Sequence, residues 1–101
     1  MRRNIILFCS AGLSTSLLVN NMKKVAKEIG YDCNINAYGI NELNRQVKNA
    51  DIVLLGPQIR FNFDRVKSIA KDIPVILIEP RLYGSFDGHA IISLVKKELN
   101  D

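Results

Sequence analysis

Near its N-terminus the chain reads Ile5-Ile6-Leu7-Phe8-Cys9-Ser10-Ala11-Gly12-Leu13-Ser14-Thr15-Ser16. Residues 5–8 form a short apolar run, which is typical of a strand buried on both faces of a parallel sheet. Residues 10–16 are small or hydroxylated except for Leu13, and the apolar side chains of residues 17–29 recur at helical spacing. The pattern predicts a strand, a loop of small residues and a helix, in that order.

A strand, loop and helix of this kind form a site for an anion, because free backbone N–H groups and the positive end of the helix dipole converge on the loop. Cys9 stands at the start of the loop, where a positive field favours the thiolate, the nucleophilic form. A lone cysteine at a strand end is also often a small buried hydrophobe. The hydroxylated residues that follow favour a cysteine that attacks phosphorus. The predicted phosphate-binding residues are Ser10, Ala11, Gly12, Leu13, Ser14, Thr15 and Ser16.

The stretch from Leu7 to Val19 resembles the phosphocysteine loop of the enzyme IIB component of the sugar phosphotransferase system, lactose/cellobiose type. Two more stretches resemble that family, Asp51-Ile52-Val53-Leu54-Leu55-Gly56-Pro57-Gln58-Ile59 and Leu82-Tyr83-Gly84-Ser85-Phe86-Asp87-Gly88. The three motifs follow the family's order and span essentially the whole chain.

The resemblance implies a phosphocarrier with Cys9 as its nucleophile. Cys9 would accept a phosphoryl group from a phosphohistidine of enzyme IIA and pass it to a sugar bound by the membrane component IIC. The expected sugar is cellobiose, chitobiose or a related β-linked disaccharide. No cofactor is implied beyond the covalent phosphate on Cys9.

Length and composition indicate a single globular domain, residues 1–101. With 48% hydrophobic and 24% charged residues the chain has an ordinary soluble composition. No apolar run approaches the ~20 residues of a membrane span. Residues 1–4 lead into only four apolar residues, so no signal peptide is expected. We therefore expect a cytoplasmic protein, and the resemblance implies that it is held at the inner face of the membrane through IIC.

Cysteine, histidine and charge content exclude several other classes. Cys9 and Cys33 are not expected to pair in a reducing cytoplasm, and Cys33 is predicted to face the core. His89 is the single histidine, so no metal site is expected. The net charge of +4 is spread over the predicted helices and forms no concentrated stripe, which argues against nucleic-acid binding.

Four strands, each followed by a helix, predict an α/β fold with a parallel sheet of order 2-1-3-4 and helices on both faces. The predicted strands are residues 5–8, 33–38, 52–55 and 74–78. A short helix capped by Asn41 is expected after the second strand. Ligands bind such sheets beyond the carboxyl ends of the strands where the order reverses. Cys9 lies at that point.

Three residues outside the loop are candidates for the same rim. Gly56-Pro57 is explained by a tight strand exit, whereas Gln58 could point its amide at the phosphate. Tyr83 lies in a long loop, residues 79–88, where it either covers the core or forms a wall of the site. Phe61 falls off the predicted buried stripe and would be an exposed docking contact. Asp87 is predicted to cap the last helix.

Two other functions compete with the phosphocarrier. Small cysteine phosphatases carry a similar loop after their first strand, with arginine six positions after the cysteine, where this chain has Thr15. Without that guanidinium the loop lacks the bidentate phosphate contact, although Glu79-Pro80 and Tyr83 resemble the acid-bearing loop of those enzymes. A non-catalytic binding domain of receiver type would need an acidic cluster at the strand ends. Asp51 lies at a strand start instead.

Overall fold

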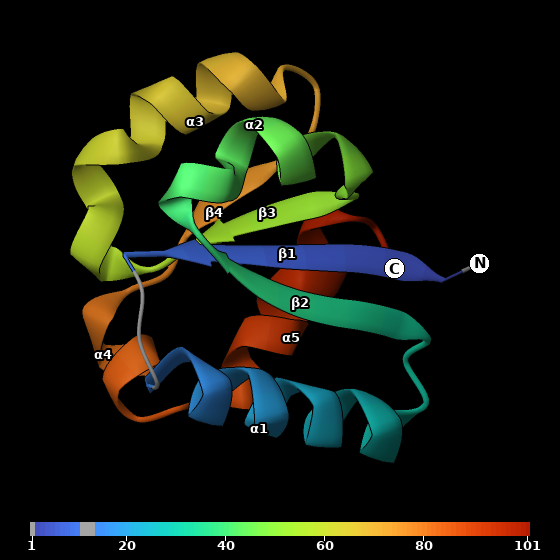
Figure 1. The fold of residues 1–101 in the computed structure, drawn as a ribbon. Coiled ribbons are helices and arrows are strands. Elements are labelled where there is room, and N and C mark those ends of the chain that lie inside the picture. The colour runs from blue at the N-terminus through green and yellow to red at the C-terminus, as the bar shows by residue number, and fades with distance from the viewer. Residues whose placement is uncertain (1, 11–13) are drawn as a thin grey trace.

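A four-stranded parallel sheet forms the centre of the molecule (Figure 1). The computed structural model describes residues 2–10 and 14–101, without the side chain of Ser14. The strands are β1 (Arg3–Cys9), β2 (Cys33–Gly39), β3 (Ile52–Leu55) and β4 (Val75–Leu77), in the order β2-β1-β3-β4. The predicted topology is confirmed, and Cys9 is the last residue of β1.

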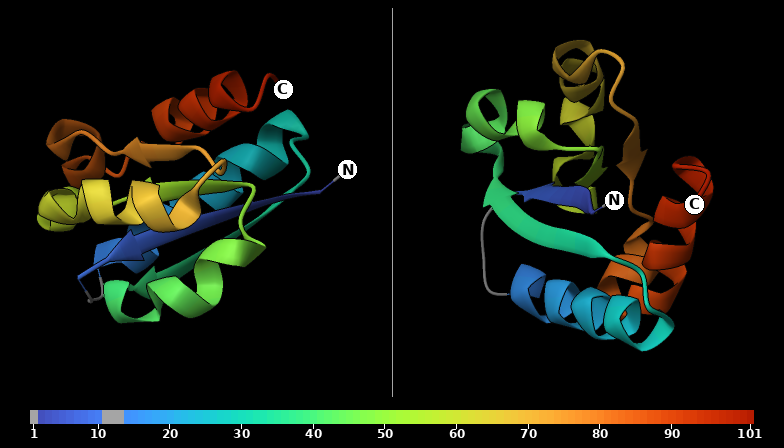
Figure 2. Two further views of the ribbon diagram at one scale, coloured as in Figure 1. Left: turned by 90° about the horizontal axis from the view of Figure 1, so that it is seen from above. Right: turned by 90° about the vertical axis from the view of Figure 1, so that its right-hand side faces the viewer.

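Helices cover both faces of this sheet (Figures 1 and 2). They are α1 (Ser14–Ile29), η1 (Ile40–Glu42), α2 (Leu43–Gln46), η2 (Val47–Asn49), η3 (Pro57–Asn62), α3 (Phe63–Ala70), α4 (Pro80–Gly84) and α5 (Gly88–Glu98). α1 and α5 lie on one face, and α2 and α3 lie on the other. None of the described helices combines the length and the apolar composition that crossing a bilayer requires.

The apolar run of β1 contributes side chains to two hydrophobic cores, one on each face of the sheet. Ile5 and Leu7 pack with α1 and α5, while Ile6 and Phe8 pack on the side of α2 and α3. This alternation follows from the two-residue period of a strand. All four side chains are at most 3% exposed, as the sequence predicted for a strand buried on both faces.

Several local predictions are corrected by the structure. Leu17 and Ile29 belong to the apolar pattern of residues 17–29 but are 56% and 46% exposed, because the buried face of α1 is narrower than that pattern suggests. β4 is shorter than the apolar run that predicted it, and Leu77 is 38% exposed because β4 is an edge strand. Asn41 does not cap a helix. It lies inside η1, whose cap residue Gly39 has no capping side chain.

The segment between β4 and α5 is not a simple loop, because residues 80–84 form the helix α4. Gly30 follows α1 with φ 72°, a conformation that glycine adopts without strain. The predicted cap of the last helix is confirmed. The Asp87 carboxylate accepts a hydrogen bond of 3.0 Å from the backbone N–H of Ala90 at the start of α5.

A bidentate ion pair joins the beginning of β1 to the end of the chain. Arg3 donates from Nε and Nη2 to the two carboxylate oxygens of Asp101, at 2.9 and 2.8 Å. The Tyr31 hydroxyl donates to the same carboxylate at 2.6 Å. The hydrogen bonds from Arg3 and then Tyr31 lower the pKa of Asp101 from 3.8 to about 2.

This lowered pKa predicts a contribution to stability that depends on pH. A carboxyl group with a lowered folded-state pKa stabilises the fold above its ordinary value of 3.8, and this contribution disappears as the pH falls to about 2. We expect Asp101→Asn to unfold at lower urea concentration than the parent at neutral pH and at the same concentration near pH 2. Asp72→Asn, at an exposed position, is the control. A difference that persists unchanged near pH 2 would contradict the prediction.

Candidate active site at the end of the first strand

Cys9 is buried at the carboxyl edge of the sheet, with 5% of its surface exposed. It lies between two neighbouring strands. Gly39 is its partner in β2, and the carbonyl of the preceding Phe8 accepts a hydrogen bond of 2.9 Å from Gly56 N–H at the end of β3. The Cys9 thiol donates to the carbonyl oxygen of Tyr38 across 3.8 Å. The ends of β2 and β3 therefore flank the end of β1, and the sulfur contacts the backbone of β2.

The surface beside Cys9 is hollowed. The hollow has a volume of about 340 Å³. It is lined by Cys9, Thr15, Ser16, Ala37, Tyr38, Gly39 and Asn41. One wall is the first turn of α1 and another is the end of β2 with η1. This volume falls within the roughly 300–1,000 Å³ of small-ligand sites. The buried thiol thus borders a space large enough for a small group.

Part of the predicted phosphate-binding loop can be placed. Ala11, Gly12 and Leu13 lie outside the described residues, as does the side chain of Ser14. Ser10 is exposed directly after β1. α1 begins at Ser14, three residues before the apolar pattern of residues 17–29, so Thr15 and Ser16 belong to its first turn. That first turn borders the hollow, where the free N–H groups of a helix favour an anion.

Tyr83 holds the first turn of α1 through a hydrogen bond to Thr15. Its hydroxyl and Thr15 Oγ1 form a hydrogen bond of 2.9 Å, and both side chains are buried. The ring belongs to the core under α1 and α5, so Tyr83 covers the core and does not line the hollow. A Cβ on Gly56 would stand 3.5 Å from the ring and 3.6 Å from the carbonyl oxygen of Phe8. Both distances are ordinary van der Waals contacts, so Tyr83 lies next to the exit of β3 without requiring a glycine there.

Removing the tyrosine hydroxyl should destabilise the fold. In Tyr83→Phe the buried Thr15 hydroxyl loses its partner, which costs about 1–3 kcal/mol of unfolding free energy. Adding Thr15→Val removes the unpaired hydroxyl. The double variant should therefore lose less unfolding free energy than the two single variants lose together. Urea unfolding of the four proteins measures this coupling. Strictly additive losses would show that the two hydroxyls do not interact.

Gln58 and Phe61 do not reach the hollow. Gln58 is exposed, and its Oε1 lies 3.0 Å from the position of a Cβ on Gly56. Phe61 is 78% exposed, as predicted, and the Arg60 guanidinium carbon lies 5.6 Å from the centre of its ring. Both residues belong to η3, and neither is among the residues that line the hollow beside Cys9.

The β2 side of the hollow was not predicted from the sequence. Asn41 was expected to cap a helix, and Ala37 and Tyr38 were expected only as part of a strand that ends before Gly39, whereas β2 includes Gly39. The parallel register Cys9↔Gly39 is the signal that could have found them, because it places the end of β2 directly beside the cysteine. No group of three His, Cys, Asp or Glu side chains among the described residues is placed to hold a metal ion.

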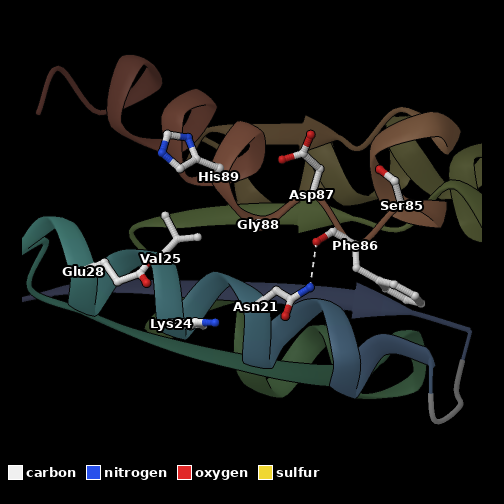
Figure 3. Close-up of a pocket in the computed structure, with 9 residues that line it drawn as sticks. All are labelled: Asn21, Lys24, Val25, Glu28, Ser85, Phe86, Asp87, Gly88 and His89. Atoms are coloured by element: carbon white, nitrogen blue, oxygen red, sulfur yellow. Dashed lines mark hydrogen bonds between the residues drawn. The ribbon is translucent and has the colours of Figure 1, made fainter.

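A second hollow, of about 430 Å³, lies between α1 and the start of α5 (Figure 3). Asn21 donates a hydrogen bond of 2.9 Å to the carbonyl oxygen of Phe86 along its floor. Lys24, Glu28 and His89 stand around it. This hollow contains neither Cys9 nor any predicted phosphate-binding residue, and we assign it no chemistry.

Comparison with known proteins agrees with this geometry. Residues 4–94 match the family model of the "PTS system, Lactose/Cellobiose specific IIB subunit". The chain is 40% identical over 88 residues to the oligo-β-mannoside-specific EIIB component of Bacillus subtilis (strain 168), covering 85% of each chain. It is 33% identical over 103 residues to the galactose-specific EIIB component of Lactococcus lactis subsp. cremoris (strain MG1363), covering 95% of each.

Solved structures show the same fold. The solution structure of the cellobiose-specific IIB component of Borrelia burgdorferi aligns with a TM-score of 0.82 and 37% identity, over 99% of this chain and 94% of that one. The lactose-specific IIB domain of Streptococcus pneumoniae aligns with a TM-score of 0.76 over 85% of each chain, at 16% identity, which supports the fold alone. The chain is a member of the lactose/cellobiose-specific IIB family of the sugar phosphotransferase system, whose members are phosphotransferases.

Proposed function

We propose that this protein carries a phosphoryl group on Cys9 between a phosphohistidine of enzyme IIA and a sugar bound by the membrane component IIC. The observation that carries the proposal is the position of the thiol. Cys9 ends β1, borders a hollow, and shares that hollow with the first turn of α1. A phosphoryl group on the sulfur would project into a space bordered by free helix N–H groups and the Ser16 side chain.

The reaction has two displacements at phosphorus. In the first, the Cys9 sulfur forms a bond to phosphorus while the bond from phosphorus to the histidine nitrogen breaks, and the thiol proton passes to the imidazole by way of solvent. In the second, a sugar hydroxyl oxygen forms a bond to phosphorus and the S–P bond breaks. The proton of that hydroxyl then restores the thiol. The reaction needs no cofactor beyond the covalent phosphate.

The partners are proposed from the family. Lactose-specific EIICB components of Lactococcus lactis and Staphylococcus epidermidis contain a region 24% identical to this chain, which spans 18% of each. A IIB domain joined to IIC in one chain supports a partnership between the two. We place the protein in the cytoplasm, at the inner face of the membrane through IIC. Relatives named for oligo-β-mannoside and cellobiose support a β-linked disaccharide of the cellobiose type as the sugar.

A cysteine phosphatase is the alternative to exclude. Thr15 stands where those enzymes carry the arginine that clamps the transition state, and its hydroxyl is already bonded to Tyr83. Without the clamp, a phosphocysteine is held but not efficiently hydrolysed. A non-catalytic binding domain is at odds with membership of a phosphotransferase family.

Incubation with phosphorylated enzyme IIA tests the proposal. We expect intact-mass spectrometry to show one added phosphoryl group that persists after the donor is removed. We also expect no measurable hydrolysis of p-nitrophenyl phosphate by the same protein. Rapid hydrolysis of p-nitrophenyl phosphate that requires Cys9 would instead establish the phosphatase.

A further inference from the structure

The β2 wall of the hollow carries a side-chain amide, that of Asn41. Asn41 lies in η1, two residues after Gly39, the partner of Cys9 in the β1–β2 register. Asn41 lines the hollow, is exposed, and forms no side-chain hydrogen bond with another described residue. Within the part of the chain that the structure describes, its donor and acceptor atoms remain available to a ligand.

The chain leaves space for this amide at the strand end. Gly39 has φ −69° and ψ 154°, a conformation that any residue adopts, so its backbone does not require glycine. A Cβ at Gly39 would stand 2.6 Å from Asn41 Oδ1, however, closer than real contacts allow. The missing side chain at Gly39 lets the Asn41 carboxamide lie against the strand end beside the cysteine.

The two walls of the hollow differ in chemistry. The α1 wall offers helix N–H groups and Ser16, which suit the phosphoryl oxygens. The β2 wall offers the Asn41 carboxamide, a neutral group that both donates and accepts hydrogen bonds. A neutral group does not compete for the dianion as lysine or arginine would. Asn41 is therefore suited to the group that enters from outside.

We propose that Asn41 binds the hydroxyl of the sugar that takes the phosphoryl group from Cys9, an inference that rests on the proposed function. In each displacement the entering or leaving atom lies opposite the sulfur, in line with phosphorus. The attacking hydroxyl must point a lone pair at phosphorus and its hydrogen away from it, and the Asn41 carbonyl oxygen accepts a hydrogen bond from that hydroxyl. The reacting imidazole nitrogen of a phosphohistidine carries no hydrogen. Transfer from enzyme IIA therefore needs no hydrogen-bond acceptor at this position.

Measuring the two half-reactions separately distinguishes a role in binding the sugar from a purely structural role, because a structural defect would slow both. The first is uptake of phosphate from phosphorylated enzyme IIA, followed by intact mass. The second is transfer from the phosphorylated protein to labelled cellobiose, galactose or mannobiose in membrane vesicles that carry IIC, using the sugar that the parent phosphorylates best. For Asn41→Leu we expect uptake at the parental rate and transfer to the sugar about tenfold slower. Asn44→Leu, an exposed asparagine of α2 that does not line the hollow, should match the parent in both.

Gly39→Ala offers a second variant in which Asn41 is intact but displaced. Its Cβ pushes the flexible carboxamide out of place, so transfer to the sugar should slow again while uptake does not. Equal slowing of both half-reactions in Asn41→Leu, or parental transfer in that variant, would overturn the inference and leave the carrier function standing. A parent protein that takes up no phosphoryl group, or transfers it to none of the sugars, would overturn the proposed function and this inference with it.

Discussion

Cys9→Ser is expected to take up no phosphoryl group from phosphorylated enzyme IIA. The thiol is the one sulfur nucleophile that borders the hollow beside α1 among the described residues. A serine hydroxyl of similar size fills the same space but is a far weaker nucleophile than a thiolate. Intact-mass spectrometry after incubation with the donor should show one added group on the parent and none on the variant. Circular dichroism should show the same fold for both.

Cys33→Ser is the matched control. Cys33 begins β2, pairs with Arg3 at the opposite edge of the sheet from Cys9, and packs against the core. Burial raises the pKa of its thiol, which disfavours the reactive thiolate. This variant should therefore take up phosphate like the parent. Phosphorylation of Cys9→Ser, or its loss in Cys33→Ser, would show that the phosphoryl group is not accepted by Cys9 at the end of β1.

Gly88→Ala should cause a large loss of stability. Gly88 begins α5, where it lies directly against α1. A Cβ at this position would stand 2.7 Å from the carbonyl carbon of Asn21 and 2.8 Å from the backbone nitrogen of Met22. These are backbone atoms of a helix and cannot rotate away, so α1 and α5 must separate. Overpacking of this kind costs about 3 kcal/mol of unfolding free energy, measured by urea denaturation.

Gly84→Ala controls for the loss of a glycine as such. Gly84 ends α4, and an added Cβ would meet nothing within 4 Å. Because alanine restricts the unfolded chain and favours a helix, this variant should be as stable as the parent or slightly more stable. A Gly88→Ala protein as stable as Gly84→Ala would show that the contact between α1 and α5 is looser than the structure indicates.

Most of the fold follows from local patterns in the chain. The apolar run of residues 5–8, the apolar residues 52–55 and the helical spacing of Leu18, Met22 and Ala26 each specify an element over a few residues. Short connections and right-handed crossovers then leave order 2-1-3-4 as the natural arrangement. Local patterns fail to predict which apolar side chains remain exposed at the surface. Leu17 and Leu77 are apolar in sequence but exposed, because only the packed molecule determines how wide each buried face is and which strand forms the edge.

The sequence by itself determined the order of strand, cysteine, small-residue loop and helix. That order predicts a nucleophile at an anion site because all of its parts are adjacent in the chain. Only the tertiary structure decided which distant residues complete that site. It pairs the hydroxyls of Thr15 and Tyr83, which are 68 positions apart, and brings Asn41 to the wall beside Cys9. Periodicity reports which face of an element is buried, whereas a contact between distant side chains depends on register and packing across the whole sheet.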